Sequence, residues 1–168
     1  MKSILSFFVL VSLYGNAQEM NVDKLQTIYS TISDSINSRN SSWQFYIKEI
    51  PILSIADTNH NRMRIMSPIM DSNNLTNELM QASLVANFHT ALDVKYAVSE
   101  GILWTVFIHP LKELTEDQVI DAIKQVYSAN INFGTSFSST PLSFPSRLNV
   151  LEKEEDIQII DKPKVNKI

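Results

Sequence analysis

Apolar residues recur every three or four positions in three stretches of the chain, a spacing that predicts three amphipathic helices. The first covers residues 22–36, and the second follows Asp71 and ends near Phe88. The third follows Thr115–Gln118, a capping box in which the threonine hydroxyl accepts an amide hydrogen and the glutamine reaches back to the cap. Gly134 is expected to end this last helix.

Between the first two helices the pattern changes to aromatic and β-branched residues, which favour strands. Residues 43–56 predict one or two strands interrupted near Pro51, which suits an edge position or a bulge. Residues 37–42 are polar and predict a loop, whereas residues 62–70 alternate as a half-buried strand does. The sequence therefore predicts a group of strands before the second helix.

The clearest strand signal is a hairpin whose arms are residues 93–99 and 102–109, joined by Glu100–Gly101. The second arm is apolar on both of its faces. A sheet covered by helices on one side only does not need this, because its other side can be polar. We therefore expect the second face to be covered by the C-terminal tail, a second subunit or a ligand.

Alternation along residues 62–70 places Arg62, Arg64 and Met66 on one face of the strand and Met63 on the other. The arginines could attract an acidic segment. Methionines between residues 63 and 80 either supply an adaptable binding surface or fill the core beneath the second helix. The candidate binding surface combines this strand with the second hairpin arm: Arg62, Arg64, Met66, Ile102, Trp104, Val106 and Ile108.

The predicted order is helix, strands, helix, hairpin, helix, which indicates an α+β fold with helices packed on one face of an antiparallel sheet. The order and four sequence segments resemble the YbjN-like family of proposed bacterial sensory transduction regulators and the fold of type III secretion chaperones. These segments are Met63–Ile65, Ala86–Phe88, residues 93–108 and residues 114–123. The resemblance spans residues 22–133 and implies a small, often dimeric domain that binds polypeptides and has no established active site.

The first 17 residues have the pattern of an export signal. Lys2 provides the positive start, residues 4–14 are apolar, and small residues precede a cleavage point after Ala17. The alternative is a buried N-terminal helix. With the signal at 1–17, we expect a single chaperone-like domain at residues 18–134 and a periplasmic or secreted location.

Residues 135–168 predict an irregular charged tail, because the segment is rich in serine, threonine and proline and then in acidic residues and lysine. A short strand at residues 157–160 is the one regular element that we expect within it.

Composition excludes several kinds of chemistry. The 168 residues contain no cysteine, which excludes disulfides, thiolate catalysis and the usual zinc modules. The net charge of −4 argues against non-specific nucleic-acid binding. Residues 57–61 begin like a calcium loop, but Arg62 and Pro68 occupy the positions that need glycine and glutamate, so a hairpin turn is expected.

We expect no catalytic residue, metal site or cofactor. The leading hypothesis is an exported, non-enzymatic protein-binding domain with a chaperone-like or regulatory role, a homodimer with a polypeptide partner and no membrane span. One alternative is a metal-dependent or hydrolytic periplasmic enzyme that uses His60, His89 or His109. Another is a structural component of the envelope. The sequence leaves the identity of the partner open.

Overall fold

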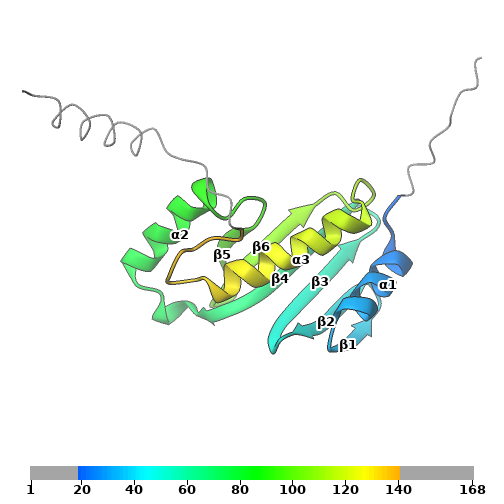
Figure 1. Ribbon diagram of the computed structural model, residues 1–168, viewed down its shortest axis with the longest axis horizontal. Coiled ribbons are helices and arrows are strands. Elements are labelled where there is room, and N and C mark those ends of the chain that lie inside the picture. The colour runs from blue at the N-terminus through cyan, green and yellow to red at the C-terminus, as the bar shows by residue number, and fades with distance from the viewer. Residues whose placement is uncertain (1–18, 141–168) are drawn as a thin grey trace, which may run out of the picture.

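The computed structural model describes residues 19–140, which form three α-helices and one six-stranded antiparallel sheet (Figure 1). The strand order is β1-β2-β3-β4-β6-β5. The α+β class and the predicted element order are confirmed. The elements are α1 (Val22–Ile32), β1 (Ser35–Arg39), β2 (Ser42–Ile47), β3 (Ile50–Asp57), β4 (Arg62–Asp71), the 3₁₀ turn η1 (Ser72–Asn74), α2 (Asn77–His89), β5 (Lys95–Ser99), β6 (Ile102–His109) and α3 (Glu116–Ile131).

Helices α1 and α3 lie across the same face of the sheet, and the core is between them and the strands (Figure 1). Tyr29 of α1 is fully buried, stacks on Phe45 and lies edge-on to Trp43. The capping box of α3 forms as predicted at Thr115–Gln118. Helix α3 buries its apolar stripe, with Val119 at its start, against β4 and β6.

The first helix is shorter than predicted, and residues 37–42 are not a loop. Helix α1 ends at Ile32, and Ser35–Arg39 form the edge strand β1, which pairs with β2. Four of the five side chains of β1 are exposed, since the strand extends past the core at the edge of the sheet. An exposed edge strand needs no apolar alternation, so the polar sequence of β1 gave no strand signal.

The break between β2 and β3 lies at Lys48 and Glu49, both with positive φ, and not at Pro51. Pro51 is the second residue of β3, an interior strand, so the predicted edge position or bulge was wrong. The position tolerates proline because pairing of β3 with β4 begins only at Leu53. The Pro51 carbonyl instead accepts a 2.7 Å hydrogen bond from the hydroxyl of Ser67.

The predicted hairpin is confirmed. Glu100 and Gly101 have φ values of 51° and 76°, the conformation that a two-residue turn between twisted strands requires. Tyr96 lies opposite Thr105 and Ala97 opposite Trp104, as the sequence predicted. Strand β4 keeps its predicted alternation from residue 62 to residue 66, and its register then shifts between residues 68 and 70.

Helix α2 differs most from its prediction. Asp71 caps the short turn η1, and α2 begins only after its own cap, Thr76. The helix lies at one end of the sheet beside β5 (Figure 1), and only Ser83 and Ala86 are buried. Its large apolar side chains do not form the expected buried face. The exposed ones are Met80, Leu84, Val85 and Phe88, whereas Met63 of β4 lies in the core.

The described part of the C-terminal region packs against the domain. Ser139 is buried, and its hydroxyl donates a 2.8 Å hydrogen bond to the carbonyl of Ala91. The predicted export signal at residues 1–17 and the predicted strand at residues 157–160 lie outside the described residues. No helix among residues 19–140 is long and apolar enough to cross a membrane.

Candidate functional site

Strand β6 presents two different faces. Leu103, Thr105 and Phe107 point to the side covered by α1 and α3 and are buried. Alternation places the remaining side chains on the opposite side, which we call the open face. No described helix lies on it (Figure 1). The open-face side chains of β6 are Ile102, Trp104, Val106 and Ile108, of which Ile108 is 54% exposed.

Cross-strand register gathers apolar side chains from neighbouring strands around these residues. Ile55 of β3 lies opposite Arg64, which lies opposite Ile108. One row further along, Leu53, Met66 and Val106 are aligned in the same way. Except for Leu53, these side chains line an open hollow of about 450 Å³. Its lining residues are Ile55, Arg64, Met66, Ala97, Ser99, Glu100, Trp104, Val106 and Ile108.

Trp104 lies near the end of the hollow that is closest to the hairpin turn. Its indole Nε1 donates a 3.2 Å hydrogen bond to the carbonyl of Ser99, which fixes the ring beside β5. The side chain is half-buried, so part of the ring remains available to an incoming group. A tryptophan with its polar atom satisfied and part of its ring exposed is a common anchor in interfaces.

Arg64 carries a positive charge within the hollow, and Glu100 carries a negative charge at its hairpin end. Arg64 lies between Ile55 and Ile108 and has no hydrogen bond or ion pair within residues 19–140. Arg62 donates a 2.9 Å hydrogen bond to the carbonyl of Asn61 and lines a smaller neighbouring hollow. The guanidinium of Arg64 is therefore free to meet an anionic group beside an apolar surface.

Five residues of the predicted binding surface line this hollow, and all seven lie on the open face. Arg62 is in the adjoining hollow, and Ile102 lies beside Asp71 at the far end of the strand pair. The predicted surface lacked the other four lining residues, Ile55, Ala97, Ser99 and Glu100. Ala97 was predicted opposite Trp104 and could have been included, whereas Ile55 enters the hollow only through the β3–β4 register.

The β5 edge of the sheet is blocked next to the hollow. The amide N–H of Tyr96 donates to Oδ1 of Asn87 at 2.7 Å, and Nδ2 of Asn87 donates to the Tyr96 carbonyl at 3.1 Å. These backbone groups would otherwise be free to pair with an added strand. Asn87 therefore occupies the outward-facing backbone groups of Tyr96.

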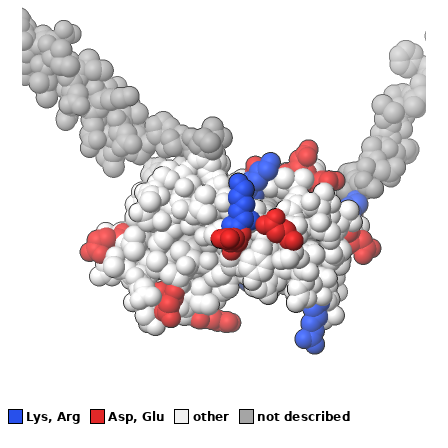
Figure 2. All heavy atoms as spheres, turned by 60° about the horizontal axis from the view of Figure 1, so that its bottom comes forward, with Lys and Arg blue, Asp and Glu red and all other residues white. Residues whose placement is uncertain are grey.

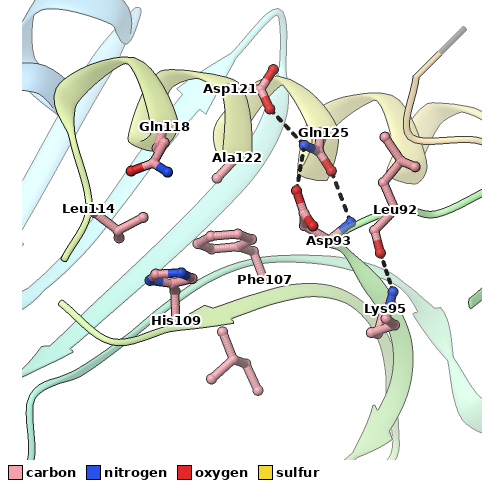
Figure 3. Close-up of a pocket in the computed structure, with 11 residues that line it drawn as sticks. Leu92, Asp93, Lys95, Phe107, His109, Leu114, Gln118, Asp121, Ala122 and Gln125 are labelled. Atoms are coloured by element: carbon pink, nitrogen blue, oxygen red, sulfur yellow. Dashed lines mark hydrogen bonds between the residues drawn. The ribbon is translucent and has the colours of Figure 1, made fainter. Parts of the chain in front are cut away.

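A second cavity, of about 460 Å³, lies between α3 and the end of β6 and is lined by both polar and apolar side chains (Figure 3). The side-chain amide of Gln125 donates to Asp93 at 3.2 Å and to Asp121 at 2.7 Å. Its oxygen accepts from the Asp93 amide at 3.3 Å. This network fastens the loop before β5 to α3, and both carboxylates already have donors.

Partial burial lowers the pKa of Lys95 at the rim of this cavity, and the nearby Asp93 carboxylate opposes that shift. The Lys95 ammonium donates a hydrogen bond to the carbonyl of Leu92 (Figure 3). Lys95 therefore also helps to hold the loop before β5.

The three histidines occupy separate places. His60 lies in the β3–β4 turn with Nδ1 2.7 Å from Asp57, His89 ends α2, and His109 stacks on Phe107. The hydrogen bond with His60 lowers the pKa of the Asp57 carboxyl. Residues 58–61 form the predicted hairpin turn. Within residues 19–140, no three histidines or carboxylates gather in a way that could hold a metal ion.

Figure 2 shows that charged side chains form small, separate groups on a surface that is otherwise uncharged. In this view acidic groups lie at the edge of the end that carries α2, and the surface between them is uncharged. Both α2 and the open face expose apolar side chains. Of these two surfaces of residues 19–140, the open face is the one that combines them with a hollow and an unpaired cation.

The chain matches no protein-family model, and no curated protein matches it. A solved structure described as "Structure of the HopA1-SchA Chaperone-Effector Complex" contains a chain that is similar in fold. The TM-score is 0.49 at 11% identity, and the match covers 67% of this chain and 98% of that chain. The YbjN-like resemblance stays a prediction, and the function proposed below rests on the surface itself.

Proposed function

We propose that this protein is a non-enzymatic binding domain that holds a segment of another polypeptide on the open face of its sheet. The observation that carries the proposal is the apolar hollow around Trp104, with Arg64 unpaired within it. Exposed apolar surface that is contiguous and hollowed commonly marks an interaction site. Side chains of four strands, β3, β4, β5 and β6, line the hollow.

The shape of the hollow fits a peptide better than a small molecule. It spans four strands, β3, β4, β6 and β5, and it is open on the outer side. At about 4.8 Å between strands, this width is about 14 Å, enough for several consecutive side chains of a bound segment. Small-molecule sites usually bury most of their ligand, which an open surface of this kind does not do.

The chemistry of the hollow specifies the kind of segment that it would bind. Ile55, Val106 and Ile108 offer apolar contacts, and Trp104 offers an aromatic anchor. Arg64 favours a carboxylate at the edge of the same contact. The expected partner is an apolar polypeptide segment with at least one acidic residue, and complementary charge would govern its specificity.

We also propose that the protein is exported by its first 17 residues and acts in the periplasm or outside the cell. The homodimer expected from the sequence would compete with a partner if it formed through the open face. A second copy would have to place its Glu100, at the hairpin end of its own hollow, opposite Arg64. A different polypeptide can supply its acidic residue in any register, so we propose it as the occupant in preference to a second copy.

The experiment that tests the function is selection from a displayed library of random peptides against the full chain. We expect enrichment of apolar peptides with acidic residues. With Arg64→Glu the charge preference should invert toward basic peptides, because the same apolar contacts then surround an anion. Lys124→Glu, on the exposed surface of α3, is the matched control and should leave the preference unchanged.

Two outcomes would contradict the proposal. One is the absence of any enriched peptide with either the wild-type chain or the variants. The other is enrichment whose charge preference follows Lys124→Glu as strongly as Arg64→Glu, since this would locate binding elsewhere. Amide NMR spectra of each variant would establish that the fold is retained.

A further inference from the structure

The chain continues for 28 residues beyond Thr140, and the open face is uncovered by residues 19–140. We propose that residues 148–161 of the same chain occupy the hollow of the open face. This inference rests on the proposed function, because the segment would fill the site that we assign to a partner. The protein would then carry a tethered competitor for its own binding site.

The described chain ends beside the β5 edge of the sheet. The amide of Ser139 donates to the Thr90 carbonyl at 3.2 Å, and the Ser139 hydroxyl bonds to Ala91. Ala91 lies four residues before Lys95, the first residue of β5. Lys95 is paired with Val106, which lines the hollow. The next residues of the chain therefore start next to the strand that borders the site.

The connection is long enough to reach the hollow. Residues 141–147 span up to about 23 Å when extended. Phe137 contacts Tyr96, whose side chain faces α3, so the chain leaves the described domain on the covered side. Crossing from β5 to β3 requires about 14 Å, at about 4.8 Å for each step between neighbouring strands, which leaves about 9 Å for passing round the β5 edge. Pro141 and Pro145 lie in this connection, and each favours an extended backbone at the residue before it.

The composition of the segment matches the chemistry of the hollow. Residues 148–161 contain six aliphatic side chains, five acidic residues and one lysine. The hollow offers apolar contacts from β3 and β6, together with the unpaired Arg64. Arg62 adds a second cation on the same face. Tethering raises the effective concentration of the segment, so even weak contacts could keep the site occupied.

Engineered cysteines can locate the segment directly, since the natural chain contains none. The test variant is the full chain with Ile108→Cys and Gln158→Cys. The matched control is the full chain with Leu84→Cys and Gln158→Cys, because Leu84 is 63% exposed and Ile108 is 54% exposed. We expect an intramolecular disulfide to form at least about tenfold faster with Ile108→Cys, because seating raises the local thiol concentration.

Equal rates at the two positions would overturn the proposal. Disulfide-linked dimers in place of the intramolecular bond would also overturn it and would assign the open face to a second copy. A charge-reversed chain with Glu154→Lys, Glu155→Lys and Asp156→Lys should lose the rate advantage. If reversal leaves the advantage intact, the charge complementarity that we invoke is wrong.

A second measurement needs no cysteine. The chain has two tryptophans, and in ¹⁵N NMR spectra of the full chain their indole signals can be told apart by Trp104→Phe. Charge reversal of the segment should shift the Trp104 signal and leave the buried Trp43 unchanged. A Trp104 signal that stays in place would show that the segment does not contact the hollow.

The peptide selection separates the failure of this inference from the failure of the proposed function. If the wild-type chain binds peptides but the disulfide forms no faster with Ile108→Cys than with Leu84→Cys, the proposed function stands and the proposal for residues 148–161 is contradicted. Peptide binding that is detected with the wild-type chain and becomes tighter after charge reversal of residues 154–156 would support both. Fast formation of the disulfide between cysteines at positions 108 and 158, without any peptide binding, would support the bound C-terminal segment and contradict the partner-binding function.

Discussion

The two faces of the sheet are made by alternate residues of the same strands, yet they have different surroundings. On the covered face, Leu103 and Ile65 are almost fully buried under α3 and its neighbours. On the open face, Ile55 and Ile108 are 44% and 54% exposed although they are equally apolar. Apolar residues on the covered face are explained by packing, whereas packing within residues 19–140 does not explain those on the open face.

This difference shows where stability and function can be separated in one strand. A residue that touches the core contributes through packing with the helices. A residue on the open face contributes little to folding until something covers it. The variants below change one face at a time and are arranged from the largest expected effect on stability to the smallest.

The first prediction compares Leu103→Ala with Ile108→Ala. Leu103 is 2% exposed, so truncation leaves a cavity and should cost about 2–5 kcal/mol of unfolding free energy. Ile108→Ala should cost less than about 1 kcal/mol, because half of its side chain is already exposed. Urea unfolding of both variants measures the contrast. A cost for Ile108→Ala close to that of Leu103→Ala would mean that Ile108 belongs to the core and not to a surface whose occupant can leave.

The second prediction concerns Asn87, which joins α2 to the edge strand β5. Asn87→Ala removes both hydrogen bonds to the Tyr96 backbone, and we expect a loss of about 1–3 kcal/mol. Hydrogen exchange should also become faster at the Tyr96 amide. Asn77→Ala, an exposed position at the start of the same helix, is the control and should leave that amide protected. Unchanged protection in Asn87→Ala would mean that the side chain does not block the edge.

The third prediction concerns two tyrosines whose hydroxyls are covered by the core. Burial raises the pKa of Tyr29 and Tyr96 above the ordinary value of about 10. Above that pH the unfolded chain loses these protons while the folded chain keeps them, so stability should fall as pH rises. Tyr29→Phe should make the decline less steep. Unfolding free energies between pH 8 and 11 provide the measurement, and an unchanged slope would contradict the assignment to Tyr29.

The parts of the fold that the sequence predicted correctly depend on neighbouring residues. Glu100 and Gly101 specify their turn locally, and Thr115 with Gln118 specify the start of α3. The open face of β6 was also predictable, since alternation alone places Trp104 with Ile108. Strand β1 was missed because it lies at the sheet edge, where exposed side chains can be polar and give no apolar alternation.

The errors depend on contacts between distant segments. Ile55 joins the hollow only because β3 and β4 align it with Arg64. The exposure of Phe88, at 82%, follows from the position of α2 beyond the sheet edge, which helical periodicity does not encode. Periodicity shows which residues share a face of an element but not whether another element covers that face.

The smallest expected effect on stability is that of Arg64→Gln. Arg64 has no hydrogen bond or ion pair within residues 19–140, so its replacement should change the unfolding free energy by no more than about 0.5 kcal/mol. The same change should weaken the binding of an acidic, apolar peptide selected against the wild-type chain. It should also reduce the salt dependence of that binding, because one charge–charge contact is lost.

Titrations of the selected peptide at two salt concentrations, with the urea midpoint measured in parallel, test both parts of this prediction. Lys124→Gln removes a cation from the helical side of the molecule and is the control for net charge. If both variants weaken binding equally, the peptide responds to the overall charge of the protein and not to Arg64. If Arg64→Gln alone lowers affinity while stability is unchanged, the arginine acts in recognition, and the open face is separated from the covered face in function as well as in packing.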